Sequence, residues 1–483
     1  MRYLSPVSLV TICWGLSGLA TYLTLARLQE LDLVQTFLLR EHLTLSAFEA
    51  TGLVWLLLAF FVYCVADLAG RFTRSTMPRS RPLIDITKAA RLTFAFNSVL
   101  LGVTALWIAT AAAKAGGLIN LAAAAYLDSL TTRDLLLENK LFVGMRLFYA
   151  ALPATACLAA ALLAKGGLTR RWRTLMTVTL LGNTLALFVL PIVMSQRLLL
   201  LQLLASAYIA ACLVRGRLFG LGWLTIGAAL FLGLWMAREA ITNPMAERSA
   251  FDIGTQKMAF YVVNDMWNAF APLARPIPHT YGGLNLEGVM FLTFTDGYFL
   301  RLLSSKLEDL DAVLGGGEFP FFTAAYVDFG AVFGLAFIAA VGFLFRRVYA
   351  RAQRSFGWAV VYGQIGAALL FSSHSVYFTH QNFLFSLLLI GAVVQLSLVR
   401  PARVPRPRSL VPLPSAQTPA PVLPVPLIPD PEVAEADRPD PEPLLFRTTR
   451  RSLPEALQAS IARHIAFLQS NRTKPGGGSH GTA

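Results

Sequence analysis

The sequence predicts an all-α integral membrane protein with about ten transmembrane helices. Two observations predict this fold class. Hydrophobic residues make up 55% of the 483 residues and charged residues only 14%, a composition that does not suit a surface facing water. The apolar residues also occur in runs close to the ~20 residues that cross ~30 Å of hydrocarbon. We therefore expect lipid to be the solvent for most of the chain.

Ten apolar runs have the length and composition of membrane-spanning helices. The first follows a single basic residue and is not followed by a clear cleavage site, so we expect it to be retained as a helix. The predicted spans are 7–26, 49–69, 92–113, 147–164, 174–194, 198–214, 218–237, 322–344, 356–373 and 382–399.

Lysine and arginine residues collect in short clusters between these runs. Membrane topology therefore explains the net charge of +14 without a nucleic-acid partner. Because short basic loops stay on the cytoplasmic side, the pattern predicts a bacterial inner-membrane protein with both termini in the cytoplasm. The clusters lie in segments 70–91, 165–173, 215–217 and 346–354.

Two long segments, about 114–146 and 238–321, then face the periplasm, and the larger one precedes the eighth span. It contains Pro- and Gly-rich turns and two stretches of helical periodicity, the second from Phe299 to Val313. We expect amphipathic helices of this kind to lie along the interface or to cap the bundle.

The chain changes in composition after its membrane domain, residues 1–400. Residues 401–444 hold 14 of the 26 prolines, so segment 401–450 is predicted to be a disordered cytoplasmic tail. Segment 451–483 follows, with a short amphipathic helix and a flexible C-terminus. Ser452 and Glu455 have capping-box spacing at the start of that helix.

The sequence contains no metal-binding or soluble-enzyme motif. All four cysteines lie in apolar segments, so we expect neither a disulfide nor a metal cluster. The six histidines form no metal-binding pattern, and we expect His374 and His380 to have no nearby carboxylate partner. We therefore expect any chemistry to use polar residues at the periplasmic face, without a metal or cofactor.

Three arginines lie where the topology disfavours positive charge. Arg197 occupies a very short turn in LPIVMSQRLLLLQLL. Its guanidinium either binds phosphate oxygens in a bidentate manner or reaches toward lipid headgroups from a helix end. The same alternatives apply to Arg146, which begins a span, and to Arg238, which ends one; for these two an interfacial anchor is favoured.

The large loop contains the turn-rich stretch ARPIPHTYGGLNLEG, with Arg275, His279 and Tyr281. Irregular backbone at a membrane surface often lines a site, although an ordinary solvated loop also explains it. Arg301 follows and either binds a ligand or pairs with Glu308 or Asp309.

Segment 315–343, GGGEFPFFTAAYVDFGAVFGLAFIAAVGF, places Glu318 and Asp328 on either side of Tyr326 at the mouth of an apolar helix. A carboxylate buried in a helix end is costly unless it is paired. Asp328 is therefore either a functional group, acting as a general base or orienting an arginine, or a structural partner of an arginine.

At these residues the chain resembles the Wzy-type oligosaccharide repeat-unit polymerases of bacterial surface polysaccharides. The similarity rests on YVDFGAVFGLAFIAAVGFLF, the YGG element, GGLINLAAAAYL and the lone Arg197, and it covers residues from about 40 to 400. It implies an enzyme that takes repeat units attached to undecaprenyl diphosphate and joins them at the periplasmic face into O-antigen, capsule or exopolysaccharide. Membrane lipids, a flippase and a chain-length regulator are the further partners it implies.

In such a polymerase a sugar hydroxyl attacks the anomeric carbon of the growing chain, and undecaprenyl diphosphate leaves. Fixed cations are needed where charge develops on the diphosphate. The resemblance implies Arg197 as the first diphosphate ligand, with Arg275 or Arg301 as a second. The candidate substrate-binding residues are Arg197, Arg275, Arg301, Tyr281, Tyr326 and Arg146. The candidate catalytic residues are Asp328, His279 and Glu318, with Asp328 or His279 accepting the hydroxyl proton.

Three other functions remain as alternatives. An O-antigen ligase uses a similar donor and places a histidine in the large loop, for which His279 is the candidate. A transporter for a lipid-linked oligosaccharide or anion would have polar residues in mid-span and helices broken by Gly or Pro in two symmetric halves. A scaffold of a secretion complex would make the proline-rich tail the working part.

Overall fold

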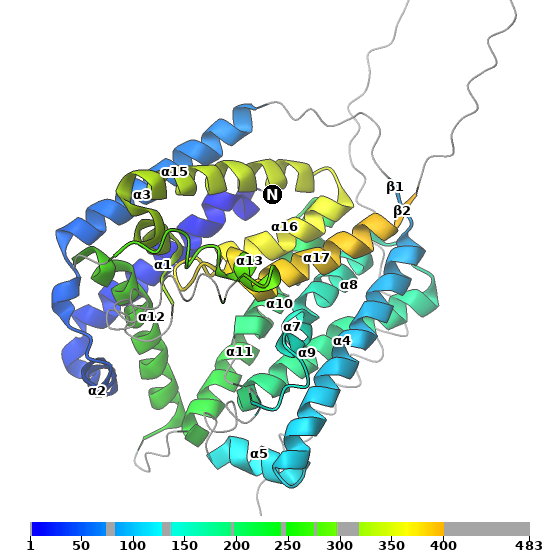
Figure 1. Cartoon of the computed structure of the whole chain (residues 1–483), viewed down its shortest axis with the longest axis horizontal. Helices are drawn as coiled ribbons and strands as arrows, with labels where there is room; N and C mark the ends of the chain where they lie inside the picture. Colours follow the sequence, from blue (N-terminus) through cyan, green and yellow to red (C-terminus); the bar gives the residue numbers. More distant parts are fainter. Residues whose placement is uncertain are drawn as a thin grey trace, which may run out of the picture. The chain divides into compact units, whose positions relative to one another are not determined.

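The computed structural model describes residues 2–73, 83–127, 136, 138–194, 198–242, 248–274, 278–295, 297 and 318–399 (Figure 1). The described residues form helices and one two-stranded antiparallel sheet, in which β1 pairs with β2. The main helices are α1 (Pro6–Ala26), α2 (Asp32–Arg40), α3 (Ala50–Phe72), α4 (Ile86–Lys114), α5 (Leu118–Leu127), α7 (Met145–Ala150), α8 (Leu152–Lys165), α9 (Arg170–Met194), α10 (Leu198–Arg215), α11 (Leu221–Thr242), α12 (Ala250–Ala274), α13 (Glu287–Leu292), α15 (Phe321–Ala352), α16 (Phe356–Leu369) and α17 (Gln381–Leu396). The remaining elements are η1 (Arg2–Leu4), η2 (Leu28–Glu30), η3 (Leu45–Ala47), η4 (Tyr377–Thr379), β1 (Leu83–Ile84) and β2 (Leu398–Val399).

The architecture is that of a multi-pass, all-α membrane protein. Seven helices in the described ranges are long and apolar enough to cross a membrane. They are α1, α3, α4, α7 joined to α8, α9, α10 and α15, while α16 and α17 are shorter apolar helices. Each of the ten predicted apolar runs overlaps a helix over most of its length.

The structure differs from the predicted spans most clearly in four places. The spans expected at 356–373 and 382–399 are longer than their helices, since α16 ends at Leu369, α17 ends at Leu396 and β2 follows it. The span expected at 147–164 consists of α7 and α8, which meet at Ala151. The span expected at 322–344 is part of α15, which continues to Ala352 and is interrupted at Gly330. The interruption becomes important at the candidate site.

The segment expected to be the large loop contains a long helix. α12 has 25 residues, as many as a transmembrane helix, and packs against α1, α2 and α11. α2 and α12 share an apolar cluster that includes Phe37 and Phe260. The second predicted helical stretch of this loop, residues 299–313, lies outside the described residues, as does the tail, residues 401–483.

The helices begin where the sequence carries starting signals. The Ser5 hydroxyl accepts a hydrogen bond from the Ser8 backbone N–H at 3.4 Å, and Pro6 occupies the first helical position of α1. The Asp85 carboxylate accepts from the Lys88 backbone N–H at 2.9 Å at the start of α4.

Small residues bring the helices together in the middle of the bundle, where α8, α10 and α16 pack against one another (Figure 1). A Cβ added to Gly363 of α16 would lie 2.8 Å from the Ala210 Cβ and 3.1 Å from the Cys157 Sγ. α15 and α3 approach one another in the same way, because Gly342 lies against Tyr63. Lipid tails are as apolar as the helices, so the hydrophobic effect does not drive helices together in a membrane. Close van der Waals packing at small residues takes its place.

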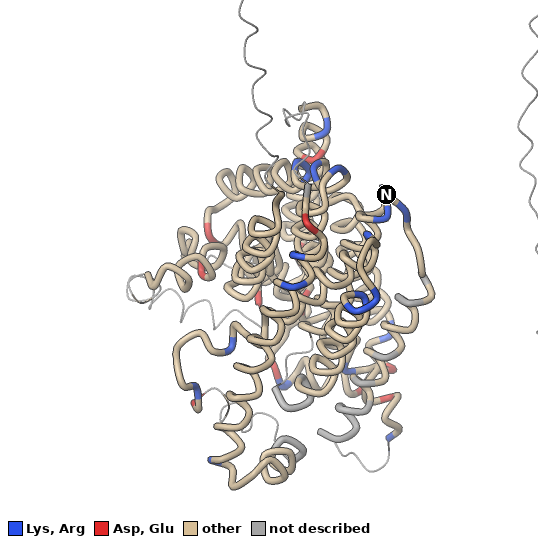
Figure 2. The backbone as a smooth tube through the Cα atoms, turned by 90° about the vertical axis from the view of Figure 1, so that its right-hand side faces the viewer, with Lys and Arg blue, Asp and Glu red and all other residues tan. Residues whose placement is uncertain are grey.

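The directions of the helices define two ends of the bundle. At one end the Arg347 guanidinium donates to the Thr73 carbonyl at 2.8 Å, and the Lys165 ammonium lies 5.7 Å from the Phe356 ring centroid. We call this the basic end, since the four predicted basic clusters adjoin it. Figure 2 shows several Lys and Arg positions near the top of the view, at the height of α3 and α15 in Figure 1. α15 and α17 begin at the opposite end, and the candidate site lies there.

Candidate functional site

Asp328 anchors the turn that follows the large loop's proline-rich stretch. The side chain is fully buried, and its two oxygens accept hydrogen bonds from the Thr280 hydroxyl, the Leu284 N–H at 3.1 Å and the N–H and side-chain amide of Asn285, both at 2.7 Å. A carboxylate has about four acceptor positions, so these donors occupy its capacity. The chemistry of Asp328 is therefore that of a structural anchor, and its observed partners are the turn residues rather than an arginine.

Gly330 breaks α15 two residues after this anchor. Its φ of 70° and ψ of −172° are accessible essentially only to glycine. The break lets the His279 Nδ1–H donate to the Val327 carbonyl at 3.1 Å, while a Cβ on Gly330 would lie 3.1 Å from His279 Nε2. His279 also packs edge-on against Tyr326, with 5.9 Å between ring centroids. These contacts place His279 and Tyr326 in the support of the turn.

A basic cavity lies beside this turn at the same end of the bundle. It has a volume of about 470 Å³ and receives the side chains of Lys140 and Arg146. Three apolar residues of its wall, Leu141, Phe142 and Val143, are 58%, 45% and 79% exposed. The cavity therefore combines positive charge with an apolar rim. The remaining lining residues are Gly144, Leu147, Phe291, Gln381 and Asn382.

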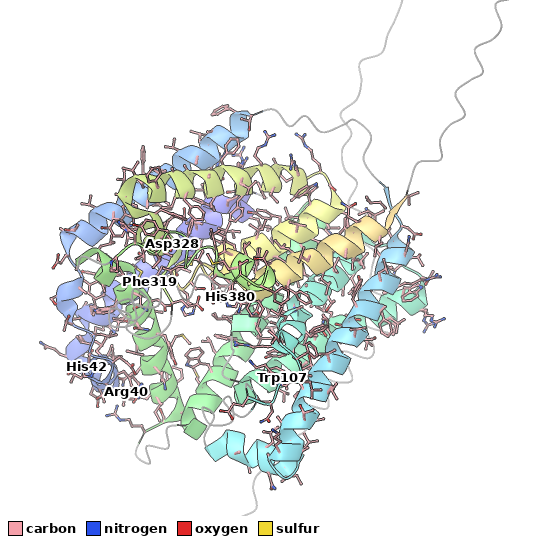
Figure 3. The ribbon with its side chains drawn as sticks, viewed as in Figure 1. Arg40, His42, Trp107, Phe319, Asp328 and His380 are labelled. Atoms are coloured by element: carbon pink, nitrogen blue, oxygen red, sulfur yellow. The ribbon has the colours of Figure 1, made fainter. Side chains whose placement is uncertain are left out.

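A smaller, acidic cavity adjoins the basic one. It has a volume of about 140 Å³ and is lined by Glu287, Glu318 and His380. Figure 3 labels two of its lining residues, His380 and Phe319. Desolvation, and secondly the charge of Glu318, raise the pKa of Glu287. The predicted site residue Glu318 thus has a carboxylate neighbour on α13. The other lining residues are Leu284, Gly288, Phe319, Ala324, Val376 and Thr379.

The wall between the two cavities is a close crossing of backbones. α13 passes over segment 379–381 at Gly288, where an added Cβ would overlap the Thr379 carbonyl oxygen and the Gln381 nitrogen. Consecutive residues then face different cavities, since Thr379 and His380 line the acidic one and Gln381 and Asn382 the basic one. A ligand that spans both cavities would therefore pass His380.

The prediction that His374 lacks a carboxylate neighbour is wrong. Its Nδ1 lies 2.8 Å from the Oδ1 of Asp265, which is 109 residues away on α12. Desolvation lowers the pKa of His374, but the charge of Asp265, its hydrogen bond and the charge of Glu318 together raise it above the ordinary value of 6.5. The sequence gives no sign of this pair, because its two residues are 109 positions apart.

A buried polar chain fixes the loop that carries both histidines. The Tyr377 hydroxyl donates to Gln202 Oε1 at 2.6 Å, and Gln202 Nε2 donates to Gln364 Oε1 at 2.9 Å. The Tyr377 ring lies parallel to the His380 imidazole, with 5.8 Å between centroids. Satisfied polar networks of this kind hold a single side-chain arrangement.

Three of the predicted site residues are not tested. Arg197, Arg275 and Arg301 lie outside the described residues, so they remain predictions. Tyr281 adopts a left-handed conformation with φ of 51° and is 71% exposed at the top of the turn. Among the candidates within the described residues, Arg146 lines the basic cavity and Glu318 the acidic one.

The site residues predicted from the sequence do not include Asp265, His374, His380, Glu287 or Lys140. Only a signal from spatial contact could have found them, because each lies in an ordinary loop or helix position. Within the described ranges, no group of three His, Cys, Asp or Glu residues is arranged to hold a metal ion.

Comparison of the chain with protein-family models, with curated proteins and with solved structures found no match.

Proposed function

We propose that this protein polymerises oligosaccharide repeat units carried on undecaprenyl diphosphate, as a metal-independent glycosyltransferase of a bacterial inner membrane. The observation that carries the proposal is the pair of adjoining cavities of opposite charge at one end of an apolar helical bundle. The resemblance of segment 326–345 to Wzy-type polymerases supports the same activity.

The basic cavity suits the head of a lipid-linked donor. A diphosphate needs fixed cations where charge develops as it leaves, and Arg146 and Lys140 supply positive charge there. The exposed apolar rim at Leu141, Phe142 and Val143 suits the polyprenyl chain, which must remain among lipids. Arg197, Arg275 and Arg301 are proposed as further ligands of the diphosphate.

The acidic cavity suits the acceptor sugar. Carboxylates accept hydrogen bonds from sugar hydroxyls, and a neutral imidazole can both accept and donate them. Glu287, Glu318 and His380 provide such groups next to the cationic cavity. The attacking hydroxyl and the leaving diphosphate would then lie on the two sides of segment 379–381.

We infer the orientation from the basic end of the bundle. Short basic loops remain in the cytoplasm, so the basic end is cytoplasmic and the two cavities face the periplasm. This arrangement exposes the site to the leaflet in which flipped, lipid-linked repeat units are found.

The test is complementation with an Arg146→Ala variant in a strain that lacks this gene, followed by electrophoresis of lipid-linked and surface glycans. Removing a cation that stabilises the departing diphosphate should reduce chain elongation by about 10²-fold, leaving single repeat units. The matched control is Arg170→Ala, an exposed arginine at the basic end, which should give long chains. Equal abundance of both variants in the membrane is confirmed by immunoblot.

Other outcomes identify the alternatives. Accumulation of finished polymer on the lipid carrier, with no transfer to the lipid A core, would identify a ligase. Repeat units trapped on the cytoplasmic face would identify a transporter. Long chains from Arg146→Ala at wild-type abundance would remove the basic cavity from the donor site.

A further inference from the structure

The loop between α16 and α17 carries two histidines whose hydrogen bonds require opposite tautomers. His374 and His380 are six positions apart in this loop, and each uses Nδ1 for its hydrogen bond. The chemistry of the partner decides in each case whether Nδ1 donates or accepts, and therefore what Nε2 does.

His374 is held as a base. An ionised carboxylate can only accept, so the 2.8 Å contact with Asp265 Oδ1 requires a proton on His374 Nδ1. The Nε2 of the neutral ring then carries a lone pair. A carboxylate that fixes an imidazole in this tautomer is the arrangement that catalytic histidines use to accept protons.

His380 is held as a donor. The backbone N–H of Asn382 donates to its Nδ1 at 3.3 Å, as the N-terminal cap of α17, so the ring proton of the neutral form is on Nε2. A positive charge at this position would face the positive end of the α17 dipole and break the cap. Desolvation and the charge of Arg146 lower the pKa of His380, against an opposing effect of Glu318.

Both histidines belong to the loop that lines the acidic cavity. Val376, Thr379 and His380 line that cavity, and the Phe321 N–H donates to the Ser372 carbonyl at 2.9 Å, which holds the loop just before His374 beside the segment that begins at Glu318. The charge of Glu318 acts to raise the pKa of both rings, while desolvation keeps the pKa of His380 below its ordinary value. His380 lies in the wall between the two cavities, and the charge of Arg146, which lines the basic cavity, lowers the pKa of its ring.

We propose that His374 Nε2 is the general base for the acceptor sugar hydroxyl and that His380 Nε2–H is the hydrogen-bond donor to the departing diphosphate oxygen. This assignment rests on the proposed polymerase function and replaces His279 and Asp328 as the base. Asp265 is a positioning residue, because it acts through His374.

The step balances as follows in atoms and charge. The hydroxyl proton moves to His374 Nε2 while the hydroxyl oxygen forms a bond to the anomeric carbon of the donor. The bond from that carbon to the diphosphate oxygen breaks, and undecaprenyl diphosphate leaves with the electron pair. His380 keeps its proton and stabilises the new negative charge, and the His374 imidazolium releases its proton to water.

The pH dependence of the reaction follows from the groups that face His374. These are Asp265 on α12 and Glu318 before α15, with Cys13 of α1 against the neighbouring Ser373 at 3.0 Å. Because His374 must be neutral to act, the rate should rise with pH through a pKa above 6.5. Asp265→Asn removes the charge that raises this pKa, so the rise should move to lower pH.

The first test measures elongation by the full chain in nanodiscs, using lipid-linked oligosaccharide extracted from a strain that lacks this gene. His374→Gln should reduce the rate by about 10²-fold or more, since no base remains. His380→Gln keeps an N–H donor and should retain more activity than His380→Leu. His42→Asn, an exposed histidine far from α13 in sequence and outside both cavities, should leave the rate unchanged.

The second test reads the tautomers without substrate, by ¹⁵N NMR of [¹⁵N]histidine-labelled protein, with signals assigned from the His374→Gln and His380→Gln spectra. We expect the neutral rings to carry the proton on Nδ1 in His374 and on Nε2 in His380. The same tautomer in both rings, or a pH–rate profile unchanged in Asp265→Asn, would overturn the proposal. No elongation by the wild-type chain would instead reject the polymerase function, and the NMR result would still stand.

Discussion

At the scale of single residues, the site depends on polar groups whose partners come from distant parts of the chain. Asp328 was expected to be costly to bury unless paired, and the structure supplies its partners in the turn at Thr280, Leu284 and Asn285. These hydrogen bonds offset the free-energy cost of burying the carboxylate, and they hold the turn against the start of α15. The same logic explains why Asp265 is stable beside His374.

We predict that Asp328→Asn destabilises this turn by about 3 kcal/mol, because an amide would present N–H to groups that are themselves donors. Unfolding in detergent mixtures and limited proteolysis of segment 278–295 would measure the effect. Thr280→Val removes one of the hydrogen bonds and should cost about 1–2 kcal/mol. Unaltered proteolysis in Asp328→Asn would contradict the anchoring role.

At the scale of elements, two glycines set how the helices of the site meet. Gly330 turns the chain of α15, so that residues before it approach the turn and residues after it run along α3. Gly288 lets α13 cross segment 379–381 at backbone distance, and this crossing divides the two cavities. A side chain at either position would separate elements that the site requires in contact.

For Gly330→Ala we expect a loss of about 1–3 kcal/mol, because the backbone conformation is unfavourable for any residue with a Cβ and the added methyl group meets His279. The thermal midpoint of the detergent-purified protein measures the loss. Gly182→Ala in α9, where an added Cβ would meet no atom within 4 Å, is the matched control and should unfold at or above the wild-type temperature. Equal midpoints for Gly330→Ala and wild type would argue against a required break.

At the scale of the whole molecule, the chain divides into two units, residues 1–404 and 405–483. The first unit is closed near its end by the β1 and β2 pairing, where Leu83 pairs with Val399 and the Asp85 N–H donates to the Ser397 carbonyl at 2.9 Å. The two cavities of the candidate site lie within the first unit.

Truncation after Val404 should therefore leave chain elongation and membrane abundance within about twofold of the wild-type values. Truncation after Leu396 is the comparison, because it also removes Ser397 and β2 and should lower abundance or thermal stability. Complementation with both forms, scored by glycan electrophoresis, makes the measurement. Loss of polymer export with intact elongation in the form that ends at Val404 would support the scaffold function instead.

The sequence by itself determined the membrane fold class and the positions of the helices, because the need to satisfy backbone hydrogen bonds in lipid makes an apolar run of ~20 residues a helix whatever its neighbours are. The run at 49–69 became α3 and the run at 92–113 became α4 with small changes at the ends. The special character of Asp328 and Glu318 was also visible, since charge at the end of an apolar helix is rare.

Only the tertiary structure decided which polar groups meet. Asp265 reaches His374 across 109 residues, and Asn285 reaches Asp328 across 43. Arg146 and Glu287 enter neighbouring cavities from opposite sides of segment 379–382. The hydropathy of a segment predicts whether that segment forms a membrane helix. The partners of a buried charge depend instead on how the helices pack and on close contacts at glycines, which involve segments far apart in the sequence.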